Sequence, residues 1–170
     1  MIQVVTVVMQ PGGGILVPDK IEKRIELKAP VARVWQALTN YREFGEWFRV
    51  ALTEPFLVGA TVRGNILHPG YEHVVFEAKI EKMIEEELFS WTWAHPKTMA
   101  KEHYKPDYTG EPRTLVEFRL QPTETGTLLT VTESGFDQLP DDRREQQYKG
   151  NEGGWAQQMT NIEVYLGEHA

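Results

Sequence analysis

The chain has 170 residues, no cysteine, and 18 basic against 25 acidic side chains, which gives a net charge of −7. Its length predicts one domain with a core large enough to fold without cross-links. The absence of cysteine excludes disulfides, thiolate nucleophiles and cysteine-ligated metals. The acidic balance argues against nucleic acid and anionic membrane surfaces as partners, because both attract a surplus of Lys and Arg. Aromatic residues are in excess at 11%, and five of them are tryptophan.

The first 17 residues differ from the rest, and we expect an N-terminal arm or tail over 1–17 and a single domain over 18–170. Residues 2–8 are β-branched and predict a strand, onto which residues 15–17 pair back as a hairpin; the alternative is a tail. The start carries no Lys or Arg, unlike a signal peptide, and no stretch approaches the ~18 apolar residues of a membrane helix. We therefore expect a cytoplasmic protein.

The next part of the chain predicts a strand, two helices and a series of strands. Residues 21–27 alternate between apolar and polar, as in a half-buried strand. Pro30 is suited to the start of a helix, Asn40 to its end, and residues 41–48 form a second short helix. Strand patterns and short turns then predict an antiparallel sheet. The segments with strand patterns are 56–58, 61–67, 73–83, 88–93, 114–120 and 127–134.

The C-terminal segment predicts an amphipathic helix that starts after Pro140 and is interrupted at Gly150, Gly153 and Gly154. Its apolar stripe consists of Trp155, Met159, Ile162 and Leu166. A helix of some 15 residues is about 22 Å long, so it crosses a curved sheet without filling the concave side. We therefore expect an α+β fold with a largely apolar cavity between sheet and helix, as in many ligand pockets.

Several local phrases occur in this order: AP at 29–30, VWQALT at 34–39, WF at 47–48, PFLVG at 55–59, LFSWTW at 88–93, GTLLTVTESGF at 126–136 and GW at 154–155. As an ordered set over residues 20–168 they resemble the SRPBCC or START-like superfamily, and within it the activator of heat-shock protein 90 ATPase homologue-like family. The resemblance implies the helix-grip fold and a hydrophobic cavity under the C-terminal helix. It does not imply one reaction, because a fold does not fix a function.

Glu133 is the most informative polar residue and the only catalytic candidate. Strand parity places it on the inward face with Leu129 and Val131. The resemblance implies a polar side chain facing the cavity at this position. Partial desolvation is expected to raise the pKa of its carboxyl, which would let it orient a ligand or act as a general base. The alternative is a strand-end position where it meets water or an arginine.

The expected cavity wall is mainly aromatic, although ordinary core packing is the alternative for each residue taken singly. We expect at least three of the five tryptophans to line one cavity. The predicted ligand-binding residues are Trp47, Phe76, Phe89, Trp91, Trp93, Phe118, Glu133, Phe136, Trp155, Met159 and Ile162.

Other chemistry has little support in the sequence. The histidines, at 68, 73, 95, 103 and 169, lack metal-ligand spacing, so we expect no metal site and surface positions for them. The chain has no G-x-S-x-G, Walker or G-x-G-x-x-G motif, and we expect no cofactor. The long charged loop over residues 95–112 departs from the family pattern; it is either a lid over the cavity mouth or a solvated excursion.

We therefore predict a protein that binds a small hydrophobic or aromatic ligand, as a monomer or as a homodimer joined by strand addition of the N-terminal arm. The first alternative is an enzyme of the polyketide cyclase or dehydratase type that uses the same cavity, as the resemblance allows. The second alternative is an interaction module like the chaperone-ATPase activators. We rank it last, because a single domain lacks the extra domain that such activators carry.

Overall fold

The computed structural model describes residues 8–9, 15–16 and 18–170. In the N-terminal arm, β1 (Val8–Met9) pairs antiparallel with β2 (Ile15–Leu16), as the hairpin prediction required for these positions. The remainder of that prediction, residues 2–7 and 17, lies outside the described residues.

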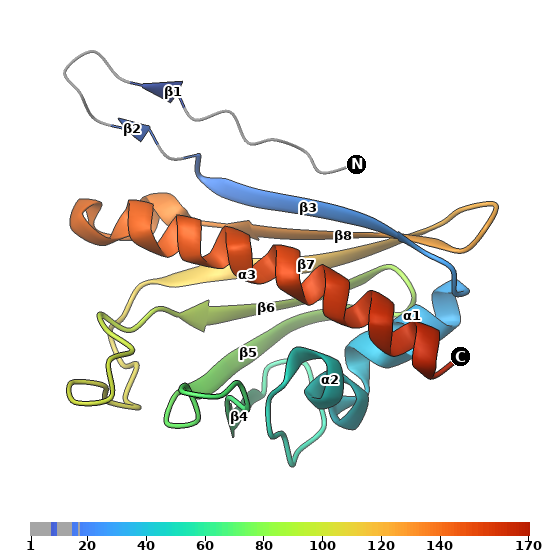
Figure 1. The fold of residues 1–170 in the computed structure, drawn as a ribbon, viewed down its shortest axis with the longest axis horizontal. Coiled ribbons are helices and arrows are strands. Elements are labelled where there is room, and N and C mark those ends of the chain that lie inside the picture. Colours follow the sequence, from blue (N-terminus) through green and yellow to red (C-terminus); the bar gives the residue numbers. More distant parts are fainter. Residues whose placement is uncertain (1–7, 10–14, 17) are drawn as a thin grey trace.

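A six-stranded antiparallel sheet forms one layer of the fold, in the strand order β3-β8-β7-β6-β5-β4 (Figure 1). Its strands are β3 (Lys20–Leu27), β4 (Thr61–Asn65), β5 (Val75–Ile84), β6 (Leu88–Ala94), β7 (Arg113–Pro122) and β8 (Thr127–Ser134). Every pair of neighbouring strands is antiparallel. From β4 to β8 each strand pairs with the next one in the chain, and β3 closes the order by pairing with β8. This is the α+β arrangement that the sequence predicted.

One predicted strand is absent, since residues 56–58 lie outside the sheet. Leu57 and Val58 are 61% and 62% exposed, whereas Phe56 is buried. The Phe56 ring packs between Phe44 and Phe89, with centroid distances of 5.3 and 5.1 Å. The segment therefore anchors a loop through one aromatic ring and does not alternate between two faces.

Two short helices follow β3, namely α1 (Val31–Thr39) and α2 (Tyr41–Phe48). Asn40 ends the first and caps the second. Its side-chain oxygen accepts hydrogen bonds from the backbone N–H groups of Arg42 and Glu43, at 3.0 and 3.2 Å. Because these N–H groups have no partner within the helix, the cap stabilises the sharp turn between α1 and α2.

The C-terminal helix α3 (Asp141–Glu168) has 28 residues and crosses the strands of the sheet (Figure 1). The predicted interruption at the glycines is wrong. Tyr148 before them and Trp155 after them are both buried on the same side of one continuous helix. Tertiary packing of that stripe outweighs the low helix propensity of glycine. At 1.5 Å per residue the helix is about 42 Å long.

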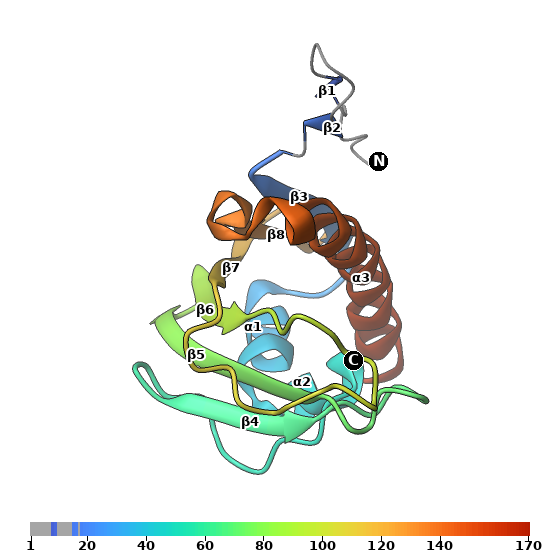
Figure 2. The ribbon, with the colours of Figure 1, turned by 90° about the vertical axis from the view of Figure 1, so that its left-hand side faces the viewer.

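The sheet curves around one side of the molecule and α3 lies on the other, with α1 between them (Figure 2). Aromatic side chains fill this interior around Phe44, whose ring stacks on Phe48 at 4.8 Å and meets Trp91 edge-on at 5.6 Å. This core occupies much of the space between helix and sheet. No helix in the described ranges is long and apolar enough to cross a membrane.

The glycines of α3 provide a test of the packing argument. A Cβ added at Gly153 meets no atom within 4 Å, so Gly153→Ala should raise the free energy of unfolding by about 0.5–1 kcal/mol through helix propensity alone. Gly126, in the turn between β7 and β8, is the contrasting case. A Cβ added there would lie 2.0 Å from the carbonyl oxygen of Leu27, so Gly126→Ala should lower the free energy of unfolding by about 1–3 kcal/mol. Urea denaturation measures both, and destabilisation by Gly153→Ala would contradict the free space at that position.

Candidate functional site

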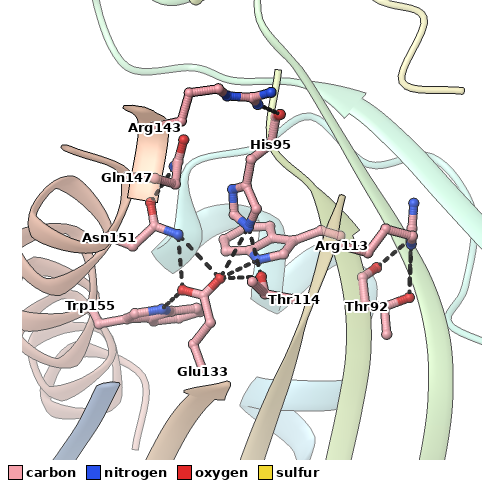
Figure 3. A network of polar contacts seen from close by, with 10 residues as sticks. Thr92, His95, Arg113, Thr114, Glu133, Arg143, Gln147, Asn151 and Trp155 are labelled. Atoms are coloured by element: carbon pink, nitrogen blue, oxygen red, sulfur yellow. Dashed lines mark hydrogen bonds and ion pairs between the residues drawn. The ribbon is translucent and has the colours of Figure 1, made fainter. Parts of the chain in front are cut away.

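Glu133 lies in β8 with its side chain inward, as strand parity predicted, and its exposed fraction is 0%. Four side chains donate hydrogen bonds to its carboxylate (Figure 3). Oε2 accepts from Trp93 Nε1 at 2.7 Å and from Thr114 Oγ1 at 2.5 Å. Oε1 accepts from Trp155 Nε1 and from Asn151 Nδ2, both at 2.9 Å. The donors come from β6, β7 and α3, so one carboxylate joins the helix to the sheet.

His95 completes this cluster, and its predicted surface position is wrong because the side chain is only 3% exposed. Its Nε2 lies 2.7 Å from Thr114 Oγ1 and 3.4 Å from Glu133 Oε2. The single hydroxyl hydrogen of Thr114 is donated to Glu133, so Nε2 of His95 carries a hydrogen and donates to Thr114. Arg143 Nη2 donates to the carbonyl oxygen of His95 and holds the start of the loop against α3.

The pKa of Glu133 lies below its ordinary value, which corrects the expected increase. Burial by itself raises the pKa of this carboxyl, but the interaction with His95, together with hydrogen bonds from Thr114 and Trp155, outweighs it. The carboxylate is therefore ionised at neutral pH. Its oxygens already accept bonds from four side chains, so Glu133 acts as a fixed acceptor inside the protein.

A pocket of about 300 Å³ lies beside this cluster, between one flank of α3 and the ends of β5 and β6. Its apolar wall includes Trp93 and Trp155, whose ring centroids are 5.7 Å apart. Its α3 flank consists of Gln147, Gly150, Asn151, Gly154, Trp155 and Gln158. Glu133 is absent from the lining and lies behind the two indoles that it holds.

The loop over residues 95–112 connects β6 to β7 between the predicted ends, and Pro96, Met99 and Tyr108 of this loop line the pocket. The Tyr108 hydroxyl donates to the carbonyl oxygen of Val75 at 2.5 Å, and Tyr104 Oη accepts from the backbone N–H of Val75 at 2.8 Å. Two tyrosines thus fasten the loop to the start of β5. Movement of the loop as a lid stays a prediction.

The predicted site residues divide into three groups. Phe76, Trp93 and Trp155 line the pocket, and Glu133 lies directly behind it. The others are buried in the core away from the pocket: Trp47, Phe89, Trp91, Phe118, Phe136, Met159 and Ile162. Two of the five tryptophans line the pocket, and not three. Phe89, Trp91 and Phe118 point inward from the sheet as predicted, but their rings pack against one another and fill that space.

Sequence reasoning missed His95 and Asn151, although a signal existed for each. His95 continues the alternation of Trp91 and Trp93 by one more step, which places it on the inward face. Asn151 precedes Trp155 by one helical turn and shares its face. It was missed because the helix was expected to break at the glycines.

A curved antiparallel sheet, two short helices after its first strand and a long C-terminal helix across its concave side define the helix-grip class of folds. Within this class, the chain belongs to the family described as Activator of Hsp90 ATPase homolog 1-like protein, whose model matches residues 28–167. No protein with a curated description matches the chain.

Solved structures share the fold at low sequence identity. Protein MLL2253 from Mesorhizobium loti is 23% identical with a TM-score of 0.69, and the match covers 89% of this chain and 98% of that one. DynU16, a protein in the dynemicin biosynthetic locus, is 22% identical with a TM-score of 0.66, over 88% of this chain and 48% of its own. The Aha1 dimer from Colwellia psychrerythraea is 21% identical with a TM-score of 0.60, over 85% and 92%.

The buried carboxylate predicts a pH dependence of stability. Because the folded-state pKa of Glu133 lies below the unfolded value of about 4.3, ionised Glu133 stabilises the fold above pH 4.3, and this stability is lost as the pH falls through the folded-state pKa. Glu133→Gln should lower the free energy of unfolding by about 3 kcal/mol at pH 7 and flatten its change between about pH 5 and 3. Urea denaturation across this range measures both effects.

The matched control is Glu117→Gln on β7, where the carboxylate pairs with a 58% exposed Arg119. An exposed pair contributes under about 1 kcal/mol, so this variant should keep both the stability and the pH profile of the parent. Equal pH profiles for the Glu133 variant and the parent would contradict the assigned role of the buried carboxylate.

Proposed function

We propose that this protein binds a small, flat, apolar ligand in the pocket between α3 and the ends of β5 and β6. The observation that carries the proposal is the way Glu133 holds Trp93 and Trp155, since one buried carboxylate accepts the N–H of both indoles. With their polar groups satisfied behind the wall, the rings offer apolar surface to the pocket. A rigid aromatic wall with few polar groups is typical of small-molecule sites.

The size of the pocket indicates the size of the ligand. A volume of about 300 Å³ lies at the lower end of the range for ligand pockets. Phe48 and Phe76 add further ring surface to the wall. One or two fused aromatic rings match this shape, so naphthalene and 2-naphthol are suitable probes.

An enzyme of the cyclase or dehydratase type would have to use another acid or base than Glu133. The carboxylate does not line the pocket, its exposed fraction is 0%, and it is ionised and bonded to four donors. These facts support a positioning role for Glu133 and favour binding over catalysis. The family description supports the interaction module, but no particular contact in the site favours it.

The cytoplasmic location and a monomeric or homodimeric state belong to the same proposal. The lack of a membrane-spanning helix in the described part of the chain supports the first. A dimeric structure among the fold neighbours supports the homodimeric state.

Addition of naphthalene or 2-naphthol should raise the melting temperature in proportion to occupancy and quench tryptophan fluorescence, because ligands that bind the folded state stabilise it. Gly154→Leu should weaken both effects at least tenfold. Gly154 lines the pocket, and a Cβ added there meets no atom within 4 Å, so the new side chain has room on the pocket flank.

Gly153→Leu is the matched control, because Gly153 also has free space for a side chain but does not line the pocket. It should bind both probes as the parent does. The proposal fails if neither probe changes the melting temperature or fluorescence, or if the two leucine variants lose binding equally.

A further inference from the structure

We propose that Nδ1 of His95 is the polar recognition point of this pocket and accepts a hydrogen bond from a ligand hydroxyl group, so that the ligand class is a hydroxylated aromatic compound. The inference rests on the proposed binding function and adds a ligand chemistry to it. It is carried by the position of one ring whose two nitrogens have different surroundings.

The first nitrogen, Nε2, is fully used by the protein. It donates to Thr114 Oγ1 at 2.7 Å and lies 3.4 Å from Glu133 Oε2 (Figure 3). These contacts place a hydrogen on Nε2. In a neutral imidazole with this tautomer, Nδ1 carries a lone pair and acts as an acceptor.

The second nitrogen, Nδ1, has no hydrogen-bond partner within residues 18–170. His95 lines the pocket, and only 3% of its surface is exposed. Nδ1 is not among the enclosed polar atoms that lack a partner, so it is open to the pocket and a donor in the pocket can reach it. An acceptor that the protein leaves free at the pocket wall therefore points to a donor supplied by the occupant.

Four other polar side chains of the pocket lining have partners within the protein, whereas His68 and Tyr71 of the lining are exposed to solvent. The Tyr108 hydroxyl donates to the carbonyl oxygen of Val75, and Asn151 donates to Glu133. The amide oxygen of Asn151 accepts from Gln147 Nε2 at 2.8 Å, and Gln158 Nε2 donates to the carbonyl oxygen of Phe48 at 3.0 Å. The recognition of one hydroxyl group thus falls to His95, while the rings of the ligand pack against the aromatic wall.

A matched set of probes tests this inference: 2-naphthol, its methyl ether 2-methoxynaphthalene, and 2-naphthoate. The parent protein should bind 2-naphthol at least tenfold more tightly than the methyl ether, because the ether leaves Nδ1 without a donor. Titration by tryptophan fluorescence measures the affinities. Equal affinity for naphthol and ether would overturn the inference and leave the proposed binding function intact. Tighter binding of 2-naphthoate than of 2-naphthol would also overturn it, because it would identify Nδ1 as a donor to an anion.

His95→Phe should remove the preference for 2-naphthol over the ether. The matched control is His68→Phe, since His68 also lines the pocket but is exposed, and it should keep the preference. If the His95 variant fails to fold, ¹⁵N-histidine NMR of the parent decides the question. The Nδ1 resonance of His95 should shift on addition of 2-naphthol and stay in place with naphthalene. A resonance that does not respond to bound 2-naphthol would overturn the inference, and no binding of any probe would overturn both proposals.

Discussion

The fold depends on one buried negative charge. The Glu133 carboxylate accepts bonds from β6, β7 and α3 while it is itself fixed in β8. A buried charge is strongly destabilising unless every part of it is paired, so the donors from the sheet and from the helix have to be present together. This requirement sets where α3 crosses the sheet, and it also sets the orientation of the two indoles that line the pocket.

The position of that charge explains why a pocket exists on one side of the cluster and not on the other. On one side, aromatic rings around Phe44 and Trp91 pack edge to face and fill the interior. On the other side, Trp93 and Trp155 form the border between the packed core and the pocket. Their N–H groups point to Glu133, so their rings line the pocket. The charge thus lies behind the pocket wall and makes that wall rigid. Rigid walls favour binding, since less conformational freedom is lost when a ligand enters.

The similarity to other solved structures extends to the fold and does not identify the chemistry of the site. Structures near 20% identity share the curved sheet and the long helix with this chain. Such a scaffold is compatible with many functions, so the residues around the pocket have to carry any functional argument. Here they are the paired indoles, the ionised carboxylate behind them and one histidine nitrogen that the protein leaves free.

The sequence by itself determined the features that depend on local periodicity. The bounds of α2 and β8 and the inward direction of Glu133 follow from the residue pattern along a short segment. The loop over residues 95–112 follows from its prolines, its glycine and its charged residues. Only the tertiary structure decided the unbroken length of α3, the burial of His95 and the direction of the Glu133 pKa shift. It also decided which aromatic rings fill the core and which face the pocket. These features depend on contacts between residues far apart in the chain, and no local pattern contains that information.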